Sequence, residues 1–521
     1  MNKYLCGNAV AALLLASAVH GQNPRFSEST LGLVPAAVSM ILTPDQQHLA
    51  YVVPEGGAKR IFFDGRAAGP QFDGAFVESS FVSSHDGRTA YAIVKETKDA
   101  ECSSCGPQGQ WRAVIDGQAG PVYDRISRFA FSSDGKSVAY GAITIVDGKD
   151  RWSLVVNGQA TSLPYDALSY KSPQFSPDGQ RLAYIAKKGT KTVVVVDGKE
   201  GPAYDKIGNP IPAFSADGRH MAYTARNYGQ PEVVVLDGQP GPGFDNIPAT
   251  SLIFSPDGGR LAYGGQSENG KWRVVTDGLA GPEYDQVDNL VFSPDGRHLA
   301  YHAKRAGKWT LIVDRAEIAT GEEFAKGFAT FSPDNQRIAQ ALKQDDKWKV
   351  ITAALDGSAS HVVGGEFDRG TGLVVFSRDS KHLAFVGWNG DKRMAVLDEK
   401  RGMEFDTVSH LVFSPDGQRL AYEAGKFYKL DPSKKDTRFI VIDGAAQPEY
   451  EGLVPGSLAF SADSRHVAYA VCKGDQRIVI IDGQSSPEYR AVCSVLPKGS
   501  DGFEALVVGH QLARLAWKPQ S

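Results

Sequence analysis

Short apolar segments separated by polar turns recur along the whole chain, and residues 175–207 show the pattern most clearly. Pro177-Asp178-Gly179 precedes the apolar segment 182–184, and Asp197-Gly198 follows the apolar segment 192–196. Pro presets the backbone for a turn, Asp caps it locally and Gly adopts the left-handed conformation. With no helical periodicity between them, these segments predict four short β-strands joined by tight turns.

The pattern also predicts that such sheets pack against one another. Leu182, Ala183 and Tyr184 are apolar at consecutive positions, so both faces of their strand must be covered. Neighbouring repeats must provide that cover, because one sheet cannot. The turn recurs eleven times at a mean spacing of about 42 residues, the period of four-stranded propeller blades. Its aspartates are Asp45, Asp86, Asp134, Asp178, Asp217, Asp257, Asp295, Asp334, Asp379, Asp416 and Asp463.

The repeat has a family resemblance. Phe-Ser-Pro-Asp-Gly-x-Arg-Leu-Ala-Tyr at 175–184 resembles the WD40-like β-propeller repeat of TolB-type exported proteins and of propeller domains attached to some peptidases. The resemblance covers nearly the whole chain after residue 21. It implies an all-β fold, a β-propeller of four-stranded blades with about eleven full repeats and a partial twelfth. It implies little about function, because propellers support many activities.

The two ends of the repeat array are expected to complete one blade. Residues 32–35 resemble 452–455, which lie between a fourth strand and the next first strand. Residues 507–517 align without a gap to 412–422, so this end carries two strands of a twelfth blade. The segment before the first repeat can add a fourth strand, and such an overlap would hide the exposed sheet edges.

Repeats seven and eight are the least regular, with Asn335 and Gln340 where other repeats have Gly and Tyr. Propellers usually have between four and eight blades, and twelve in one ring would leave a wide pore. We therefore expect two packed propellers, 24–300 and 301–518, divided somewhere within 288–327. A single large ring is the alternative.

Residues 1–21 predict a secretory signal peptide. Lys3 gives a positive start, an apolar run of eleven residues covers 9–19, and cleavage is expected after Ala18 or Gly21. The run is too short to span a bilayer. We expect an exported protein, periplasmic or secreted, with no membrane span. A net charge of −4 and a pI near 6.3 give no electrostatic reason to expect nucleic acid as a partner.

Four cysteines follow the signal, and an even number in an exported chain suggests two disulfides with three possible connectivities. Cys472 ends the second strand of repeat eleven, and Cys493 lies in the crossing 490–504 to the last blade, so topology favours their pairing. Cys102 and Cys105 would then form the second bridge, which we prefer to a zinc or redox half-site.

The turns and loops separate onto two faces. The regular turns, between first and second and between third and fourth strands, form one face, here called the turn face. Loops between second and third strands lie on the other, the loop face, and vary in length, as at 95–110 and 425–438. A regular face opposite a variable one is typical of a binding scaffold. Loop 425–438 is basic and aromatic, either a contact for an anionic partner or a solvated loop; its candidate residues are Lys426, Phe427, Tyr428, Lys434 and Lys435.

Other candidate chemistry has a structural explanation. Five histidines occupy one repeat position that Arg fills elsewhere, which indicates surface residues at strand starts. Turn aspartates are expected to cap their turns rather than bind calcium. Gly265 to Lys271 matches a phosphate-loop spacing, but Trp272 stands where Ser or Thr is needed. We therefore assign no catalytic residue, cofactor or metal. The histidines are His48, His220, His298, His382 and His466.

Two function classes remain. The first is an exported, non-catalytic propeller scaffold that binds a protein or polymer partner through the loop face. The second is a propeller enzyme, of the polysaccharide lyase or hydrolase type, with a site in the central funnel. The second would need polar residues converging from several blades, and no set of that kind stands out from the repeat.

Overall fold

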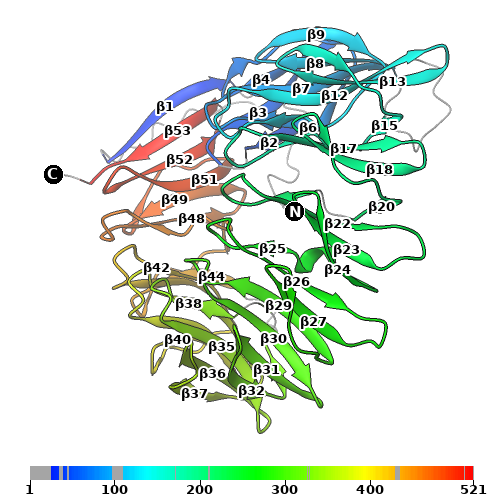
Figure 1. Ribbon diagram of the computed structural model, residues 1–521. Coiled ribbons are helices and arrows are strands. Elements are labelled where there is room, and N and C mark those ends of the chain that lie inside the picture. The colour runs from blue at the N-terminus through cyan, green and yellow to red at the C-terminus, as the bar shows by residue number, and fades with distance from the viewer. Residues whose placement is uncertain are drawn as a thin grey trace. The chain divides into compact units, whose positions relative to one another are not determined.

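The computed structural model describes residues 25–519 except 34–38, 44–45, 97–108, 170–171, 209–211, 326, 328, 429–434 and 510. Its strands form twelve antiparallel sheets (Figure 1). Each sheet has four strands in meander order, and in five sheets the first strand is broken into two short pieces. Within the described residues the one helical element is a 3₁₀ turn, η1 (Ala249–Ser251). The predicted all-β propeller of four-stranded blades is confirmed. The predicted signal peptide lies outside the described residues.

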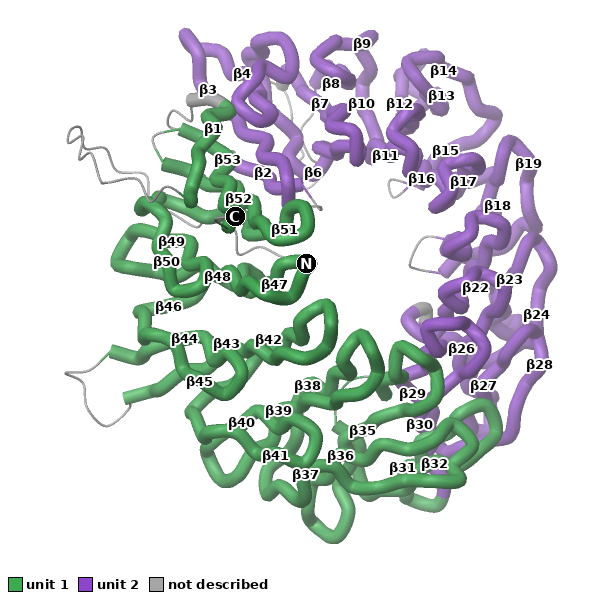
Figure 2. Tube along the Cα trace, turned by 90° about the vertical axis from the view of Figure 1, so that its left-hand side faces the viewer, with its two compact units in different colours: residues 1–36, 306–521 green, residues 37–305 purple. Residues whose placement is uncertain are grey.

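The chain divides into two compact units, which Figure 2 colours separately. Unit 1 contains residues 1–36 and 306–521, and unit 2 contains residues 37–305. The arrangement as two propellers or one ring stays a prediction. Among the described residues, no helix has the length and apolar character that crossing a bilayer requires.

Unit 2 contains η1 and the following strands: β2 (Ser39–Leu42), β3 (Leu49–Glu55), β4 (Ala58–Phe63), β5 (Arg66–Ala67), β6 (Ala75–Ser83), β7 (Thr89–Glu96), β8 (Gly109–Ile115), β9 (Gln118–Tyr123), β10 (Arg125–Ile126), β11 (Ala130–Phe131), β12 (Val138–Val146), β13 (Lys149–Val156), β14 (Gln159–Ser162), β15 (Ala167–Leu168), β16 (Gln174–Phe175), β17 (Leu182–Lys188), β18 (Lys191–Val196), β19 (Lys199–Glu200), β20 (Lys206–Ile207), β21 (Ala213–Phe214), β22 (Met221–Arg226), β23 (Glu232–Leu236), β24 (Gln239–Phe244), β25 (Ile253–Phe254), β26 (Leu261–Gln266), β27 (Trp272–Thr276), β28 (Leu279–Ala280), β29 (Gln286–Phe292) and β30 (Leu299–Arg305).

Unit 1 contains these strands: β1 (Phe26–Leu33), β31 (Lys308–Val313), β32 (Ala316–Gly321), β33 (Glu323–Phe324), β34 (Thr330–Phe331), β35 (Arg337–Gln344), β36 (Lys347–Ala354), β37 (Ser360–Phe367), β38 (Gly370–Phe376), β39 (Leu383–Asn389), β40 (Lys392–Leu397), β41 (Lys400–Arg401), β42 (Thr407–Phe413), β43 (Leu420–Lys426), β44 (Thr437–Ile442), β45 (Ala445–Ala446), β46 (Gly452–Leu453), β47 (Ala459–Phe460), β48 (Val467–Lys473), β49 (Gln476–Ile481), β50 (Gln484–Ser485), β51 (Ala491–Lys498), β52 (Gly502–Val508) and β53 (Gln511–Trp517). Each sheet is named below by its second strand.

The turns of the β17 sheet form as the sequence predicts. Asp178 Oδ1 accepts hydrogen bonds from the Ser176 hydroxyl and, at 3.1 Å, from the backbone N–H of Gln180. Asp197 and Gly198 have φ values of 50° and 77°, the positive pair that a type I′ hairpin turn requires. The aspartates of this sheet therefore have local structural roles, as expected.

Alanines allow neighbouring sheets to approach closely. Ala183 of β17 is 1% exposed and belongs to one buried cluster with Met221, Tyr223 and Ala225 of β22. The neighbouring sheet therefore covers the face of β17 that its own sheet leaves open, which confirms the expected packing between repeats.

The last sheet of unit 1 corrects one expectation. Residues 491–498, read from the sequence as a crossing, form strand β51, so the C-terminal segment contributes three strands rather than two. Val492 and Val495 are buried there, and a bulge after Val492 interrupts the alternation that would have marked the strand. Residues 507–517 thus belong to the second and third strands of their sheet, not the first and second.

The N-terminal segment completes that sheet, as predicted. Strand β1 pairs antiparallel with β53, with Phe26 opposite Trp517. Both side chains are buried in one core cluster, with Trp517 only 1% exposed. The edge of β53 is therefore covered by a strand from the other end of the chain.

Candidate functional site

The turn face is occupied by contacts that hold sheets together. Arg181 pairs through Nε with Asp197 Oδ2 of its own sheet at 3.2 Å. Its Nη1 donates to the carbonyl oxygen of Arg219 at 2.6 Å, and its Cζ lies 5.6 Å from the centre of the Phe214 ring. Both contacts are to the next sheet. Equivalent bonds to a carbonyl of the next sheet are made by Arg88, Arg260, Arg337 and Arg419.

Histidines at the same repeat position make a shorter-range contact. His220 Nδ1 lies 2.7 Å from Asp237 Oδ2 of its own sheet. The pairs His48–Asp64, His382–Asp398 and His466–Asp482 repeat this arrangement. These residues are structural, as the sequence indicated.

The predicted basic loop carries its own counter-charges. Lys426 Nζ lies 2.6 Å from Glu449 Oε1, and Lys435 Nζ lies 3.2 Å from Glu451 Oε1. The Glu449 carboxylate raises the pKa of Lys426. These two acids follow the third strand, so the loop sequence alone does not reveal them. Lys434 lies outside the described residues.

The aromatic residues of this loop are fixed against the same sheet and its neighbour. The Arg438 guanidinium lies 4.6 Å from the centre of the Phe427 ring, and the Phe427 N–H donates to Asp406 Oδ2 at 2.8 Å. The Tyr428 N–H donates to Asp436 at 3.0 Å. The structure therefore places Lys426, Phe427, Tyr428 and Lys435 in the described part of one loop, where both lysines have acidic partners.

The predicted Cys472–Cys493 disulfide is not formed in the structure. Cys472 is a free thiol whose Sγ lies against Gly452 of the adjacent strand β46. Cys493 belongs to β51, the first strand of the next sheet, rather than to a loop that could return over β48. Burial raises the pKa of the Cys472 thiol. Cys102 and Cys105 lie outside the described residues, so their pairing stays a prediction.

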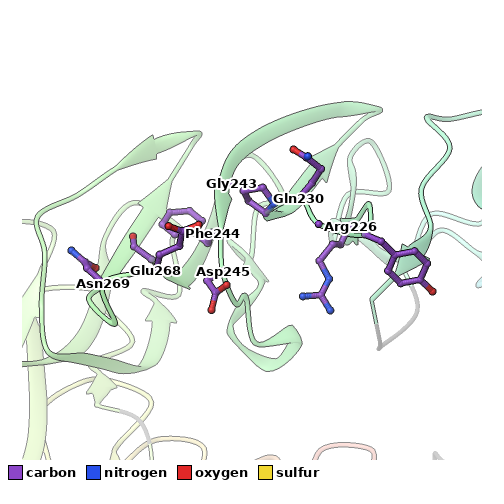
Figure 3. Close-up of a pocket in the computed structure, with 11 residues that line it drawn as sticks. Arg226, Gln230, Gly243, Phe244, Asp245, Glu268 and Asn269 are labelled. Atoms are coloured by element: carbon purple, nitrogen blue, oxygen red, sulfur yellow. The ribbon is translucent and has the colours of Figure 1, made fainter.

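A pocket that the sequence did not reveal opens on the loop face of unit 2. Its volume is about 820 Å³, and the β22–β23 loop, the end of β24 and the β26–β27 loop line it. Figure 3 shows Asp245 and Arg226 pointing toward the same side of these loops. The lining residues that the argument below uses are Arg226, Tyr228, Pro231, Phe244, Asp245 and Glu268.

Phe244 forms the buried base of this region. Its side chain is 4% exposed and lies so close to Gly265 that a Cβ there would come within 2.5 Å of the ring. Gly265 therefore lets the end of β24 pack directly on β26 of the next sheet. Asp245 follows Phe244 immediately, so this packing fixes where its carboxylate emerges.

Acidic residues at the position of Asp245 are paired elsewhere in the repeat. Asp205, for example, receives the Lys191 ammonium at 2.9 Å and the Tyr228 N–H at 2.9 Å. The Lys191 ammonium and that N–H hold the pKa of Asp205 below its usual range. Partners of the same kinds are found at Asp73, Asp124, Asp166, Asp285, Asp368, Asp406 and Glu451.

Asp245 is the exception. Within the part of the chain that the structure describes, its carboxylate makes no hydrogen bond or ion pair, and neither do the side chains of Arg226 and Glu268. Tyr228 is 77% exposed. The pocket thus presents two carboxylates, one guanidinium and an exposed aromatic ring, a set suited to binding a polar ligand.

The sequence held one signal for this pocket. Pro231 occupies the repeat position of Lys191 and Lys271. In the neighbouring repeats these lysines pair with Asp205 and Asp285, which are equivalent to Asp245. Lysine is also absent from this position in other repeats, as at Gln110 and Gln476, so the replacement by Pro231 becomes informative only when the pairing is known from the structure. Among the described residues, no group of three or more His, Cys, Asp and Glu side chains is placed to hold a metal ion.

Comparison with known proteins gives similarity in fold alone. No family model matches the chain, and no curated protein sequence matches it. Hydrazine synthase of Kuenenia stuttgartiensis aligns at 15% identity over 50% of this chain and 94% of that chain, with a TM-score of 0.27.

Two further solved structures align with about half of this chain. The Cps50 (Swd1) β-propeller domain of Myceliophteria thermophila aligns at 14% identity over 53% of this chain and 99% of that domain, with a TM-score of 0.24. TolB from Acinetobacter baumannii aligns at 12% identity over 56% of this chain and 81% of that chain, with a TM-score of 0.22. The identification of the chain as a β-propeller protein rests on its own twelve four-stranded sheets.

Proposed function

We propose that the protein is an exported, non-catalytic β-propeller scaffold that binds a protein or polymer partner through its loop face. The observation that carries this proposal is the pocket at Arg226, Asp245 and Glu268, where charged side chains have no partner within the described chain. Unpaired charges beside an exposed Tyr228 are a typical composition for a contact surface, since Tyr and Arg are enriched at interfaces.

The turn face supports the proposal by contrast. There the charged side chains that recur with the repeat form bonds within and between sheets, as for Arg181, Asp197 and His220. Such a face holds the fold together and offers few groups to a ligand. The loop face carries the variable loops and the pocket, and rigid sheets position both.

Site-specific photocrosslinking tests this division. Tyr228 is replaced by p-benzoylphenylalanine in the full chain, and the same residue is placed at Gln180, an exposed residue of the turn face, as the matched control. We expect a discrete crosslinked partner in living cells for position 228 and none for position 180. Equal crosslinking at both positions, or none at 228, would contradict the proposal. Export is tested separately by sequencing the N-terminus of the mature protein, which is expected to begin at residue 19 or 22.

A further inference from the structure

Three sheets show how a carboxylate at this repeat position binds an ammonium group. Lys191 lies 2.9 Å from Asp205, Lys271 lies 2.6 Å from Asp285, and Lys392 lies 2.8 Å from Asp406. In each case the lysine begins or directly precedes the third strand, and the aspartate follows the fourth segment of the same repeat. The arrangement is therefore a built ammonium acceptor, repeated along the chain.

In the β22 sheet this acceptor is complete except for its ammonium. Pro231 replaces the lysine, and its ring packs so closely on the backbone of β24 that a Cβ at Gly243 would come within 2.8 Å of Pro231 Cβ. Asp245 keeps its place after Phe244, but its carboxylate has no partner among the described residues. Pro231 and Asp245 both line the pocket.

We infer that Asp245 receives the side-chain ammonium of a lysine from a partner polypeptide, in the role that Lys191 and Lys271 fill within their own sheets. This inference rests on the proposed function and names the chemistry of its contact. Two carboxylates, Asp245 and Glu268, outnumber the single guanidinium of Arg226 in the lining, so the pocket complements a cation.

The other lining groups fit a lysine within a peptide chain. Tyr228, another lining residue, offers an exposed aromatic surface to the peptide that carries the lysine. Arg226, which has no partner in the described chain, is available to donate hydrogen bonds to backbone carbonyl oxygens of the same peptide. A pocket of about 820 Å³ has room for one such side chain and its flanking peptide groups.

The test uses the peptide acetyl-Gly-Gly-Lys-Gly-Gly-amide as the probe, titrated into the full chain and followed by ligand-observed NMR. The matched peptide carries Nε-acetyl-lysine, which keeps the methylene stem of lysine but has no charge. We expect the charged peptide to bind at least tenfold more tightly than the acetylated one, since loss of the charge removes the ion pair with Asp245.

Two variants of the chain and one control variant locate the effect. Pro231→Lys restores the missing lysine and should fill Asp245 from within, so that binding of the charged peptide weakens at least tenfold while the melting temperature does not fall. Asp245→Asn should weaken binding similarly without relying on a new ion pair. Asp285→Asn, at the equivalent carboxylate that already has Lys271, should leave peptide binding unchanged.

Equal affinity for the two peptides, no binding of the charged peptide, or unchanged binding in Asp245→Asn would overturn the inference. If the peptide fails while Tyr228 still crosslinks a partner, the lysine contact is wrong and the proposed function stands. If the peptide fails and no partner crosslinks at position 228, both are wrong.

Discussion

The guanidinium of Arg181 donates to the carbonyl oxygen of Arg219 at 2.6 Å, and this single bond joins one sheet to the turn of the next. The residue after Arg219 is His220, which occupies in its own sheet the position of Arg181 but pairs only with Asp237 of that sheet. Arg and His alternate at this position along the repeats, except that Ser137 stands in the third. The junctions between sheets are therefore of two kinds, with and without a guanidinium bond to the next turn.

Replacing Arg181 with Ala should lower the free energy of unfolding by about 1–2 kcal/mol, because a charge-assisted hydrogen bond and a cation–π contact between sheets are lost together. His220→Ala is the matched change at a junction without such a bond, and it should cost less than about 1 kcal/mol. Urea unfolding of the full chain, followed by tryptophan fluorescence, measures both. Equal losses in the two variants would show that the Arg contacts do not join the sheets.

Ala183→Leu should destabilise the protein by roughly 1–3 kcal/mol, since Ala183 is 1% exposed between β17 and β22 and added methylenes overpack that contact. Ala280→Leu, at an exposed alanine of β28, is the control and should be nearly neutral. The measurement is the thermal midpoint of each variant. An unchanged midpoint in Ala183→Leu would count against the close approach of the two sheets.

The turn aspartates predict loss of stability in acid. Hydrogen bonds from Ser176, Ser215 and Ser255 are the main reason that the pKa values of Asp178, Asp217 and Asp257 are lowered. A carboxyl whose pKa is lower in the folded state contributes stability that is fully present above its unfolded pKa, about 3.9. That contribution is lost as the pH falls through the lower folded value.

The stability of the protein should therefore fall steeply below about pH 4. Ser176→Ala removes one hydroxyl donor and should reduce the slope of unfolding free energy against pH in that range. Ser485→Ala, at an exposed serine of β50, should not change the slope. Urea midpoints measured between about pH 5 and pH 2 provide the data. Identical slopes for wild type and Ser176→Ala would argue against the role of the hydroxyl.

Most of the fold was predictable because the same strand and turn pattern recurs in successive repeats. The Pro-Asp-Gly turn at Asp178, the Asp197-Gly198 hairpin and the buried Ala183 each recur, so an error in one repeat does not change the assignment. The last sheet was assigned less well, because β51 has a bulge after Val492 and is followed by Gly499-Ser500-Asp501 instead of the repeat's Pro-Asp-Gly turn. The strands of this sheet are defined by their hydrogen-bonded pairing, which includes strand β1 from the other end of the chain, and the repeat pattern does not show that pairing.

The candidate site was harder to predict for the opposite reason. The pocket depends on Pro231 because lysine is absent from that position, so Asp245 has no partner from its own repeat. The sequence of a single repeat does not show that a missing lysine has this effect. The basic loop at Lys426 was visible as a run of charge, but its counter-charges Glu449 and Glu451 lie in another part of the repeat. The run of charge in the sequence therefore did not reveal that two lysines of the loop are paired, and it did not reveal the pocket at Asp245.

Cys472 should be a slow-reacting thiol. Burial raises its pKa, so little thiolate is present near neutral pH and alkylation should be slow in the folded protein. Iodoacetamide labelling followed by peptide mapping should modify Cys472 quickly only after unfolding in guanidinium. A Cys472–Cys493 cross-linked peptide from the non-reduced protein would contradict this prediction, because it would show that Cys472 forms a disulfide and is not a free thiol.

Charge reversal of the basic loop separates binding from stability. Glu substitutions at Lys426, Lys434 and Lys435 should lower the free energy of unfolding by only about 1 kcal/mol, since the pairs with Glu449 and Glu451 are largely exposed. If the loop contacts the partner, the triple variant should bind the partner that is crosslinked at Tyr228 more weakly, and that binding should no longer depend on salt concentration. Glu substitutions at Lys199 and Lys400, exposed on the turn face, are the controls. Unchanged binding of the partner would show that the loop is a solvated segment and does not contact the partner.

The pairing of β1 with β53 has a consequence for biosynthesis. Ser29 and Arg514, joined across these two strands, are 485 positions apart in sequence. A chain emerging from the ribosome therefore holds residues 26–33 without their sheet until almost all of it has been made. Contacts of such separation slow folding, because the entropy of closing a long loop is lost before any contact is gained. Unit 1 should thus mature late, and until then an unpaired strand is open to proteases and to mispairing with other nascent chains.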